Sequence, residues 1–334
     1  LCAGLAALLF VLIAYLIGVG IGIWGLNIPV GWGFDITNFV FFIGVSHAGT
    51  LISAILRVTG AEWRKPITRM AESITLIATV GGASFPSIDR GRPDRILHLV
   101  FCGRIQSAVL WDFISIATYL TGSLLYLYLP LIPDLAALRA QRVGGPIRRK
   151  LYSFLSMRWR DSPGQRRRLK RAIGIMAIII IPIAVSVHTV VSWIFGMTLR
   201  VGWHSTIFGP YFVVGAIASG IATIILAMAV FRKAYHLERF IRPLHFRNLA
   251  YMMLALDVIL IYFTLSEYLT ASYGAETADV AWLTALSSGP FMVIFWGMVI
   301  GGFLLPVIIL AVTKARSVAW TVVAAACLNV GMWF

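Results

Sequence analysis

The sequence predicts an all-α protein that crosses a membrane many times. Of its 334 residues, 60% are hydrophobic and only 12% are charged, and the mean hydropathy is +0.89. Apolar runs of about 20 residues, the length that spans the hydrocarbon core of a bilayer, recur along the chain. Charged residues are concentrated between these runs. We therefore expect two four-helix bundles with a peripheral helix or helices, rather than two soluble domains.

Nine apolar runs predict nine membrane-spanning helices. In chain order they are 3–24, 37–56, 66–84, 111–132, 172–194, 208–230, 248–268, 289–312 and 317–334. The first ends in the "GVGIG" sequence (18–22), whose small residues favour close helix packing. The chain begins at Leu1 inside an apolar run, without a methionine or the layout of a signal peptide. We therefore expect native helices beyond one end or both.

The basic residues divide the connecting segments into two sets. One set holds 23 of the 28 lysines and arginines, and it consists of 57–69, 133–171, 231–247 and 313–316. The positive-inside rule places this set in the cytoplasm. The segment 133–171 separates a first helical half (1–132) from a second (172–334), and its charges suit orientation and contact with anionic lipid rather than nucleic acid. On the opposite side, 85–110 has the mixed charges and prolines of a loop that covers or contacts something.

His47 raises the main functional question, because ionisable groups inside a membrane are costly and commonly mark substrate sites, ion paths or proton relays. It lies about 10 residues into its helix, roughly 15 Å below the outer surface. Three interpretations stay open. His47 contacts a quinone head group or relays protons, or it is a packing histidine satisfied by Ser46 and nearby helix carbonyls, or it binds haem.

Two acidic residues of the first half have structural alternatives. Asp112 opens its span from the outside, where it either caps the helix as an interfacial anion or contacts substrate. Glu72 either forms a buried ion pair with Arg69 or Lys65 or belongs to a proton path.

The second half carries further ionisable residues. Asp257 has no cation near it in sequence, which favours a proton relay. Glu267 lies near enough to the surface to be solvated instead. His188 and His204 flank an outer turn, where a structural role competes with ligation.

Cofactor motifs are scarce. The three cysteines, Cys2, Cys102 and Cys327, are far apart and predict neither a disulfide framework nor a cluster site. Membrane-bound b-type haem generally needs two imidazoles on facing helices. His47 and His188 lie in different predicted halves, so the sequence predicts no haem pair. The chain also lacks dinucleotide-binding, Walker, zinc and hydrolase motifs. We expect no metal and no redox centre of its own.

Quinol chemistry suits such a scaffold. Oxidation of a quinol releases two protons and two electrons, so the pocket needs a proton acceptor that titrates near neutrality, as histidine does. A second acid can hold the other hydroxyl. The electrons must leave through a centre on another chain.

Several long motifs carry a resemblance to one family. They are "PVGWGFDITNFVFFIGVSHAGTLISAILR", "RMAESITL", "FPSIDRGRPDR", "AVLWDFISIATYLTGSLLYLYLPLIPDLAALR" and "SVHTVVSWIFGM" followed by "GWHSTIFGPYFVVGAIASG". Over nearly the whole chain, the sequence resembles the NrfD/PsrC-type membrane subunits of polysulfide reductase-like complexes. Within them it most resembles the ActC subunits of bacterial alternative complex III.

The resemblance implies ten spans, two four-helix bundles and a multi-pass protein of the bacterial inner membrane. It implies oxidation of menaquinol or ubiquinol near the periplasmic side of the first bundle, with no haem or iron–sulfur cluster in this chain. Those cofactors would belong to the partners, which are a periplasmic iron–sulfur subunit, multihaem cytochrome c subunits and a second NrfD-like membrane subunit.

The resemblance also implies roles for individual residues. His47 of "SHAGT" and Asp112 of "LWD" are assigned to quinol catalysis. The residues assigned to line or close the quinol pocket are His47, Asp112, Asp35, Asp89 and Arg92. Those assigned to a proton-conducting path are Glu72, His188, Asp257 and Glu267. Two stretches depart from the family pattern. The loop reads "IDRGRP" where the family has an "HLGRP"-like run, and "CGRIQSAV" precedes "LWD" in place of an "FRSP"-like run. The contributions of Asp89 and His98 therefore do not follow directly from the family pattern.

Two other functions compete with quinol oxidation. The first is a secondary transporter or proton channel that uses Glu72, Asp257 and His188 without redox chemistry. The second is a passive anchor that holds an iron–sulfur protein at the membrane. Haem and iron that co-purify with the complex would favour the redox function, and a colourless homomer would favour the transporter.

Overall fold

The computed structural model describes residues 2–26, 33–89, 93–198, 200–312 and 317–334. In these ranges the chain forms helices and no β-strand, which confirms the all-α prediction. Each of the nine expected segments is helical. Within the described ranges, seven helical segments are long and apolar enough to cross a membrane. The expected span 66–84 is a helix with more polar residues, and the span 317–334 is a helix of 16 residues.

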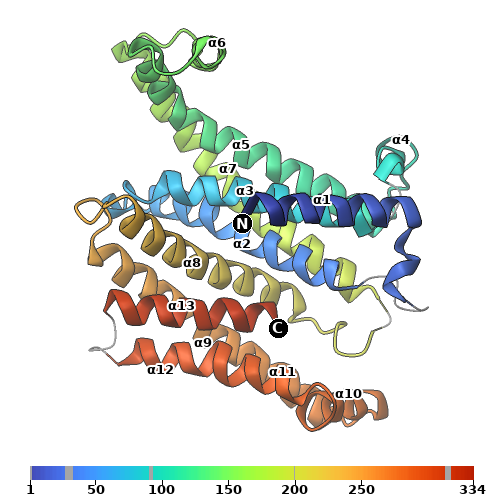
Figure 1. Cartoon of the computed structure of the whole chain (residues 1–334). Helices are drawn as coiled ribbons and strands as arrows, with labels where there is room; N and C mark the ends of the chain where they lie inside the picture. Colours follow the sequence, from blue (N-terminus) through green and yellow to red (C-terminus); the bar gives the residue numbers. More distant parts are fainter. Residues whose placement is uncertain (1, 27–32, 90–92, 199, 313–316) are drawn as a thin grey trace.

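Four helices form the first bundle, and they are α2 (Phe34–Val58), α3 (Thr68–Asp89), α5 (Ala108–Ala140) and α7 (Pro163–Gly196). In the upper half of Figure 1 they run along one another. α2 packs against both α3 and α7, and α5 contacts α3 and α7. The core between α2, α5 and α7 includes Phe39, Ile43, Tyr119, Ile180 and Val187.

The second bundle contains α8 (Phe208–Ala234), α9 (Pro243–Gly274), α13 (Val318–Trp333) and one interrupted helix. The interrupted helix consists of α11 (Met292–Trp296), the π-helical segment η4 (Gly297–Leu304) and α12 (Leu305–Ala311). In the lower half of Figure 1, α8 lies next to the first bundle. Contacts of α8 with α2 and α7 join the two bundles.

The packing corrects the expected division of the chain at one point. The span expected at 172–194, placed in the second half, belongs to α7 and packs in the first bundle. The basic segment 133–171 therefore connects two helices of one bundle. The first expected span is not a member of that bundle, because α1 (Cys2–Val19) has only Leu16 buried.

The "GVGIG" sequence also differs from its expectation. α1 ends at Val19, and a short 3₁₀ helix, η1 (Ile21–Trp24), follows. A Cβ added at Gly18, Gly20 or Gly22 would meet nothing within 4 Å. Among the described residues, these glycines therefore mark the end of a helix and not a close helix contact; Gly20 has a φ of 97°, which favours glycine.

The connecting segments gather at two ends of the bundles. The basic end, on the left of Figure 1, contains η2 (Glu62–Arg64) and α6 (Pro146–Leu155). The opposite end contains η3 (Pro93–Arg95), α4 (His98–Phe101) and α10 (Thr277–Ser287). This grouping agrees with the two sets of segments distinguished by charge.

α6 is an amphipathic helix that folds back along α5. The Tyr128 hydroxyl of α5 donates a hydrogen bond to the Leu155 carbonyl at 2.6 Å. Ile147, Leu151 and Phe154, spaced for one helix face, are exposed. α7 then begins with a capping box in which the Ser162 hydroxyl accepts a bond from the Gln165 backbone N–H at 3.3 Å.

Candidate functional site

The candidate site lies at the centre of the first bundle, where α2 is enclosed on several sides. All residues of α2 from Ile43 to Ala54 are buried. Small residues permit this enclosure. A Cβ at Gly49 would lie 2.8 Å from the Ala71 carbonyl carbon of α3, so only glycine fits that contact. The backbone N–H of Thr50 donates to the Thr75 hydroxyl of α3 at 2.9 Å.

His47 is buried in this enclosed part of α2, with only 2% of its surface exposed. Its Nδ1 lies 2.8 Å from the Ile43 carbonyl, which identifies Nδ1 as the protonated nitrogen if the ring is neutral. The imidazole stacks on the Tyr119 ring of α5, with centroids 4.1 Å apart and planes 6° from parallel. Its Nε2 has no hydrogen-bond partner among the described residues, although the Ala184 carbonyl of α7 interacts with the ring.

A second buried imidazole contacts the first. His188 of α7 is 3% exposed, and its ring centroid lies 3.8 Å from that of His47, edge to face. Its Nδ1 has no hydrogen-bond partner within the described ranges. The Nδ1 of His188 therefore remains available inside the bundle for a hydrogen bond or a proton. His188 lies eight residues from the end of α7 at Gly196, about 12 Å below that end.

This contact overturns the sequence argument about haem. His47 and His188 were expected in different halves, but they face each other from two helices of one bundle. Among the described residues, no group of three or more His, Cys, Asp and Glu side chains is arranged to hold a metal ion.

Asp112 lies toward the outer end of the same bundle. It is half-buried in the first turns of α5, seven residues before Tyr119. Seven residues make two helical turns, so Asp112 lies on the same face as Tyr119 and about 10 Å further out. Helix geometry thus places Asp112 further out along α5 than the ring of Tyr119 that stacks on His47.

The other residues expected around a quinol pocket are spread along the outer end. The Asp35 Oδ1 accepts a hydrogen bond from the Gly33 backbone N–H at 3.0 Å, which places this carboxylate at the favourable N-terminal end of α2. Asp35 also lines a groove between α1 and the ends of α2 and α3. Asp89 is the last residue of α3 and is half-buried. Arg92 lies outside the described residues.

Glu72 is buried toward the basic end of the first bundle, and neither expected ion pair forms there. The Ser53 hydroxyl donates to Glu72 Oε1 at 2.6 Å, and Oε2 has no partner within the described chain. Arg69 pairs with Asp134 of α5, and Lys65 pairs with Glu62. The ion-pair alternative for Glu72 is therefore wrong.

The ionisable residues of the second bundle lie apart from the histidine pair. Asp257 of α9 is fully buried, and neither carboxylate oxygen has a hydrogen-bond partner among the described residues. Glu267 is half-buried and lines a pocket at the outer end together with His204, which is exposed. Of the residues expected to form a site, the structure brings His47 and His188 into contact and leaves Glu72, Asp257 and Glu267 at separate positions.

Several buried hydroxyl groups around the site were not singled out from the sequence. The Tyr119 hydroxyl donates to the Ser46 carbonyl at 3.0 Å, and the Tyr126 hydroxyl lies 3.4 Å from the Ser53 hydroxyl. Tyr119 had one usable signal, its position two turns after Asp112 on one helix face. Ser53 had none, because serine is common in membrane helices without a functional role.

Comparison with known proteins finds similarity to subunits of three oxidoreductases. It is 28% identical over 64% of its length to a putative membrane subunit of the dimethyl sulfoxide reductase of Halobacterium salinarum. It is 24% identical over 85% to a subunit of the selenate reductase of Mesobacillus selenatarsenatis. It is 25% identical over 89% to an Hdr-like menaquinol oxidoreductase integral membrane subunit of Archaeoglobus fulgidus.

The chain spans 49%, 67% and 66% of these three relatives, about half to two thirds of their length. A model of one family matches nearly all of it, from residue 23 to residue 334. The resemblance to the NrfD/PsrC family inferred from the motifs is thereby confirmed, and with its helices the match identifies a multi-pass membrane protein. The chain belongs to the polysulphide reductase NrfD family.

Proposed function

We propose that this chain is the membrane subunit of a quinol-oxidising electron-transfer complex. One observation carries the proposal. Two buried imidazoles, His47 and His188, contact each other in the membrane-spanning part of the bundle. Membership of the NrfD family, together with similarity to a menaquinol oxidoreductase subunit, supports quinol as the substrate.

The chemistry of quinol oxidation fits the histidine pair. A quinol that becomes a quinone breaks two O–H bonds and releases two protons and two electrons. The Nδ1 of His188, which has no hydrogen-bond partner among the described residues, can accept one of these protons, and His47 lies beside it as a second base. Tyr119 holds the plane of His47 by stacking. In this proposal Asp112 orients the head group from the outer side, and Asp35, Asp89 and Arg92 are assigned to line or close the pocket.

The electrons require an acceptor on another protein of the complex. The resemblance to the membrane subunits of alternative complex III supports a periplasmic iron–sulfur protein as that acceptor, with multihaem cytochrome c subunits and a second NrfD-like subunit in the assembly. It also supports a bacterial inner membrane with the basic segments in the cytoplasm. The exposed apolar face of α6 and its neighbouring residues Arg148, Arg149 and Lys150 suit contact with anionic lipid at that surface.

Proton translocation is a further part of the proposal. Glu72, Asp257 and Glu267 are the carboxylates assigned to a proton path, together with His188. Glu72 and Asp257 are buried and have oxygen atoms without hydrogen-bond partners in the described parts of the chain. Ionisable groups buried in membrane-spanning helices commonly belong to proton relays, so we assign the uptake and release of protons to both residues.

Substitution of the assigned residues in the intact complex tests the function. We expect His47→Ala and Asp112→Asn to abolish quinol-dependent reduction of the iron–sulfur partner while the complex still assembles. His204→Ala, which removes an exposed histidine, is the matched control and should turn over normally. Near-normal turnover in both site variants would contradict the proposal, and so would a purified complex without haem or iron.

A further inference from the structure

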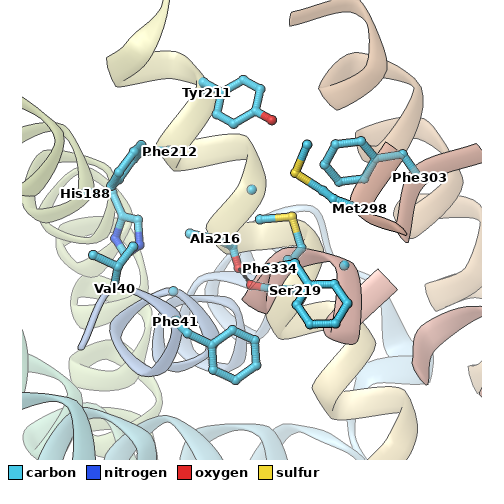
Figure 2. A pocket seen from close by; sticks show the side chains of 14 residues that line it. Val40, Phe41, His188, Tyr211, Phe212, Ala216, Ser219, Met298, Phe303 and Phe334 are labelled. Carbon is cyan, nitrogen blue, oxygen red and sulfur yellow. Dashed lines mark hydrogen bonds between the residues drawn. The ribbon is translucent and has the colours of Figure 1, made fainter. Parts of the chain in front are cut away.

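Two hollows lie between the bundles. The smaller has a volume of about 190 Å³, and Figure 2 shows His188 in its wall, opposite Met298 and Phe303 of η4. This cavity adjoins the histidine pair already described. The larger has a volume of about 740 Å³ and lies at the basic end, between α3 of the first bundle and the end of α8 in the second. We call the larger hollow the α3–α8 groove.

The walls of the α3–α8 groove are apolar. Met70, Ile74 and Ile77 line it from one face of α3, because they are three and four residues apart. Phe231 and Phe240 line the opposite wall, at the end of α8 and in the segment that follows. Ile77 is 74% exposed and Phe240 is 62% exposed, so the described chain leaves the groove uncovered. In a membrane its occupant is therefore a lipid or another membrane protein.

The depth of the groove distinguishes these two occupants. From Arg69, at the beginning of α3, to Ile77 is eight residues, or about 12 Å along the helix. One leaflet contributes about 15 Å to a hydrocarbon core of about 30 Å. Val80 is exposed one turn further along α3 but does not line the groove. A membrane-spanning helix of a partner would need a groove through both leaflets, whereas the acyl chains of a phospholipid end near the middle of the bilayer.

The mouth of the groove is positively charged. Lys65 and Arg69 line it, and each also pairs with one carboxylate of this chain. The two connecting segments that border the mouth, 57–69 and 231–247, hold nine lysines and arginines against two glutamates. The excess of positive charge therefore comes from the other basic residues of these segments. Clusters of basic residues at the end of membrane helices attract anionic lipid head groups.

We propose that the α3–α8 groove binds an anionic phospholipid of the leaflet at the basic end, which the proposed orientation makes cytoplasmic. Its phosphate group lies at the mouth near Lys65, and its acyl chains lie along the face of α3 that carries Met70, Ile74 and Ile77. The volume of about 740 Å³ falls within the range of about 300–1,000 Å³ for ligand sites. The bound lipid fills the space between the two bundles at this end. This role goes beyond the proposed function, because it requires no quinol.

Photolabelling of the purified, assembled complex tests the position of the lipid. The probe is phosphatidylglycerol with a diazirine in one acyl chain. We expect label in peptides of α3 and of the segment 231–247 that unlabelled phosphatidylglycerol displaces and phosphatidylcholine does not. Label that neither lipid displaces belongs to the lipid that surrounds every membrane helix.

Two variants with matched controls test the groove itself. Ser73→Trp fills the groove from an exposed position whose hydroxyl bonds only within α3, and should remove most of the displaceable label. Val80→Trp places the same ring on α3 outside the groove and should label normally.

The second pair of variants tests the charge at the mouth. Lys65→Gln removes one exposed positive charge and should weaken phosphatidylglycerol binding about fivefold, the effect of one basic residue near anionic lipid. Arg104→Gln removes one exposed positive charge at the opposite end and should bind normally. If Ser73→Trp does not assemble, Lys65→Gln decides the test, because it changes only an exposed side chain.

Three results would overturn the inference. Equal displacement by phosphatidylcholine would show that the mouth does not recognise an anionic head group. Displaceable label that is absent from α3, or unchanged in Ser73→Trp and Lys65→Gln, would place the lipid elsewhere. Benzoylphenylalanine in place of Ile77 that cross-links to another subunit would assign the groove to a partner protein. Quinol turnover is not measured in any of these experiments, so their outcomes are independent of the proposed function.

Discussion

Replacing Gly220 by alanine tests the contact that joins the two bundles. Gly220 lies on α8 against α2, where an added Cβ would be 2.9 Å from the Val45 carbonyl oxygen and closer still to the Ala48 Cβ. Ordinary van der Waals contact begins at 3.4 Å. Neither obstacle is a flexible side chain, so α2 and α8 must move apart by at least about 0.5 Å.

The expected cost follows from this overlap. Overpacking by one methyl group in a close-packed interior costs about 1–3 kcal/mol, whereas alanine in place of glycine improves helix propensity by up to about 1 kcal/mol. Because the obstacles are backbone atoms and a methyl group held against them, we expect a net loss of about 1–2 kcal/mol. Gly174→Ala on α7 is the control, because its Cβ would meet nothing within 4 Å.

Thermal unfolding of the purified complex, followed by circular dichroism, measures the difference. We expect Gly220→Ala to unfold at a lower temperature than the wild type and Gly174→Ala at the same or a higher temperature. Separation of α2 from α8 also displaces Ala48, the neighbour of His47, so quinol turnover should fall in Gly220→Ala only. Equal unfolding temperatures and equal turnover in the two variants would refute the packing argument.

Three other predictions concern the site and the basic segment. Tyr119→Phe removes the hydrogen bond to the Ser46 carbonyl but keeps the ring that stacks on the imidazole. The free energy of unfolding should therefore fall by about 0.5–1.5 kcal/mol, while quinol turnover persists. Loss of turnover would assign the hydroxyl a direct role. Glu72→Gln should lower the number of protons moved per electron in proteoliposomes without slowing quinol oxidation, and an unchanged ratio would remove it from the proton path. The Arg166 guanidinium, which donates a hydrogen bond to Asp161, lowers the pKa of that carboxyl below its ordinary value of 3.8. The contribution of this ion pair to stability is therefore fully present above pH 3.8. It is lost as the pH falls through the lowered pKa of the folded state. The stabilities of the wild type and Asp161→Asn should therefore differ at about pH 7 and converge in strong acid, and a constant difference would contradict the ion pair.

Much of the candidate site was visible in the sequence as separate residues. A histidine within an apolar run is unusual enough to mark His47 and His188, since apolar surroundings penalise an unpaired polar group. Helix periodicity also puts Tyr119 on the face of Asp112, although nothing in the sequence shows that this face meets His47. The partner of Arg69 could not be predicted, because Asp134 lies on another helix and no local pattern links the two.

The amino-acid sequence by itself determined the helices and the two ends of the molecule. A bilayer supplies no hydrogen-bond partners to the backbone, so each long apolar run must form a helix, and the basic residues between the runs then gather at one end. Only the tertiary structure decided that α7 packs in the first bundle, that His47 meets His188 across 141 positions of sequence, and that a cavity opens beside them. The physical reason is that apolar helices do not choose neighbours by hydrophobicity within a bilayer. Their contacts depend on the fit of small residues such as Gly49 and Gly220 against particular partners, and this fit exists only once the helices are assembled.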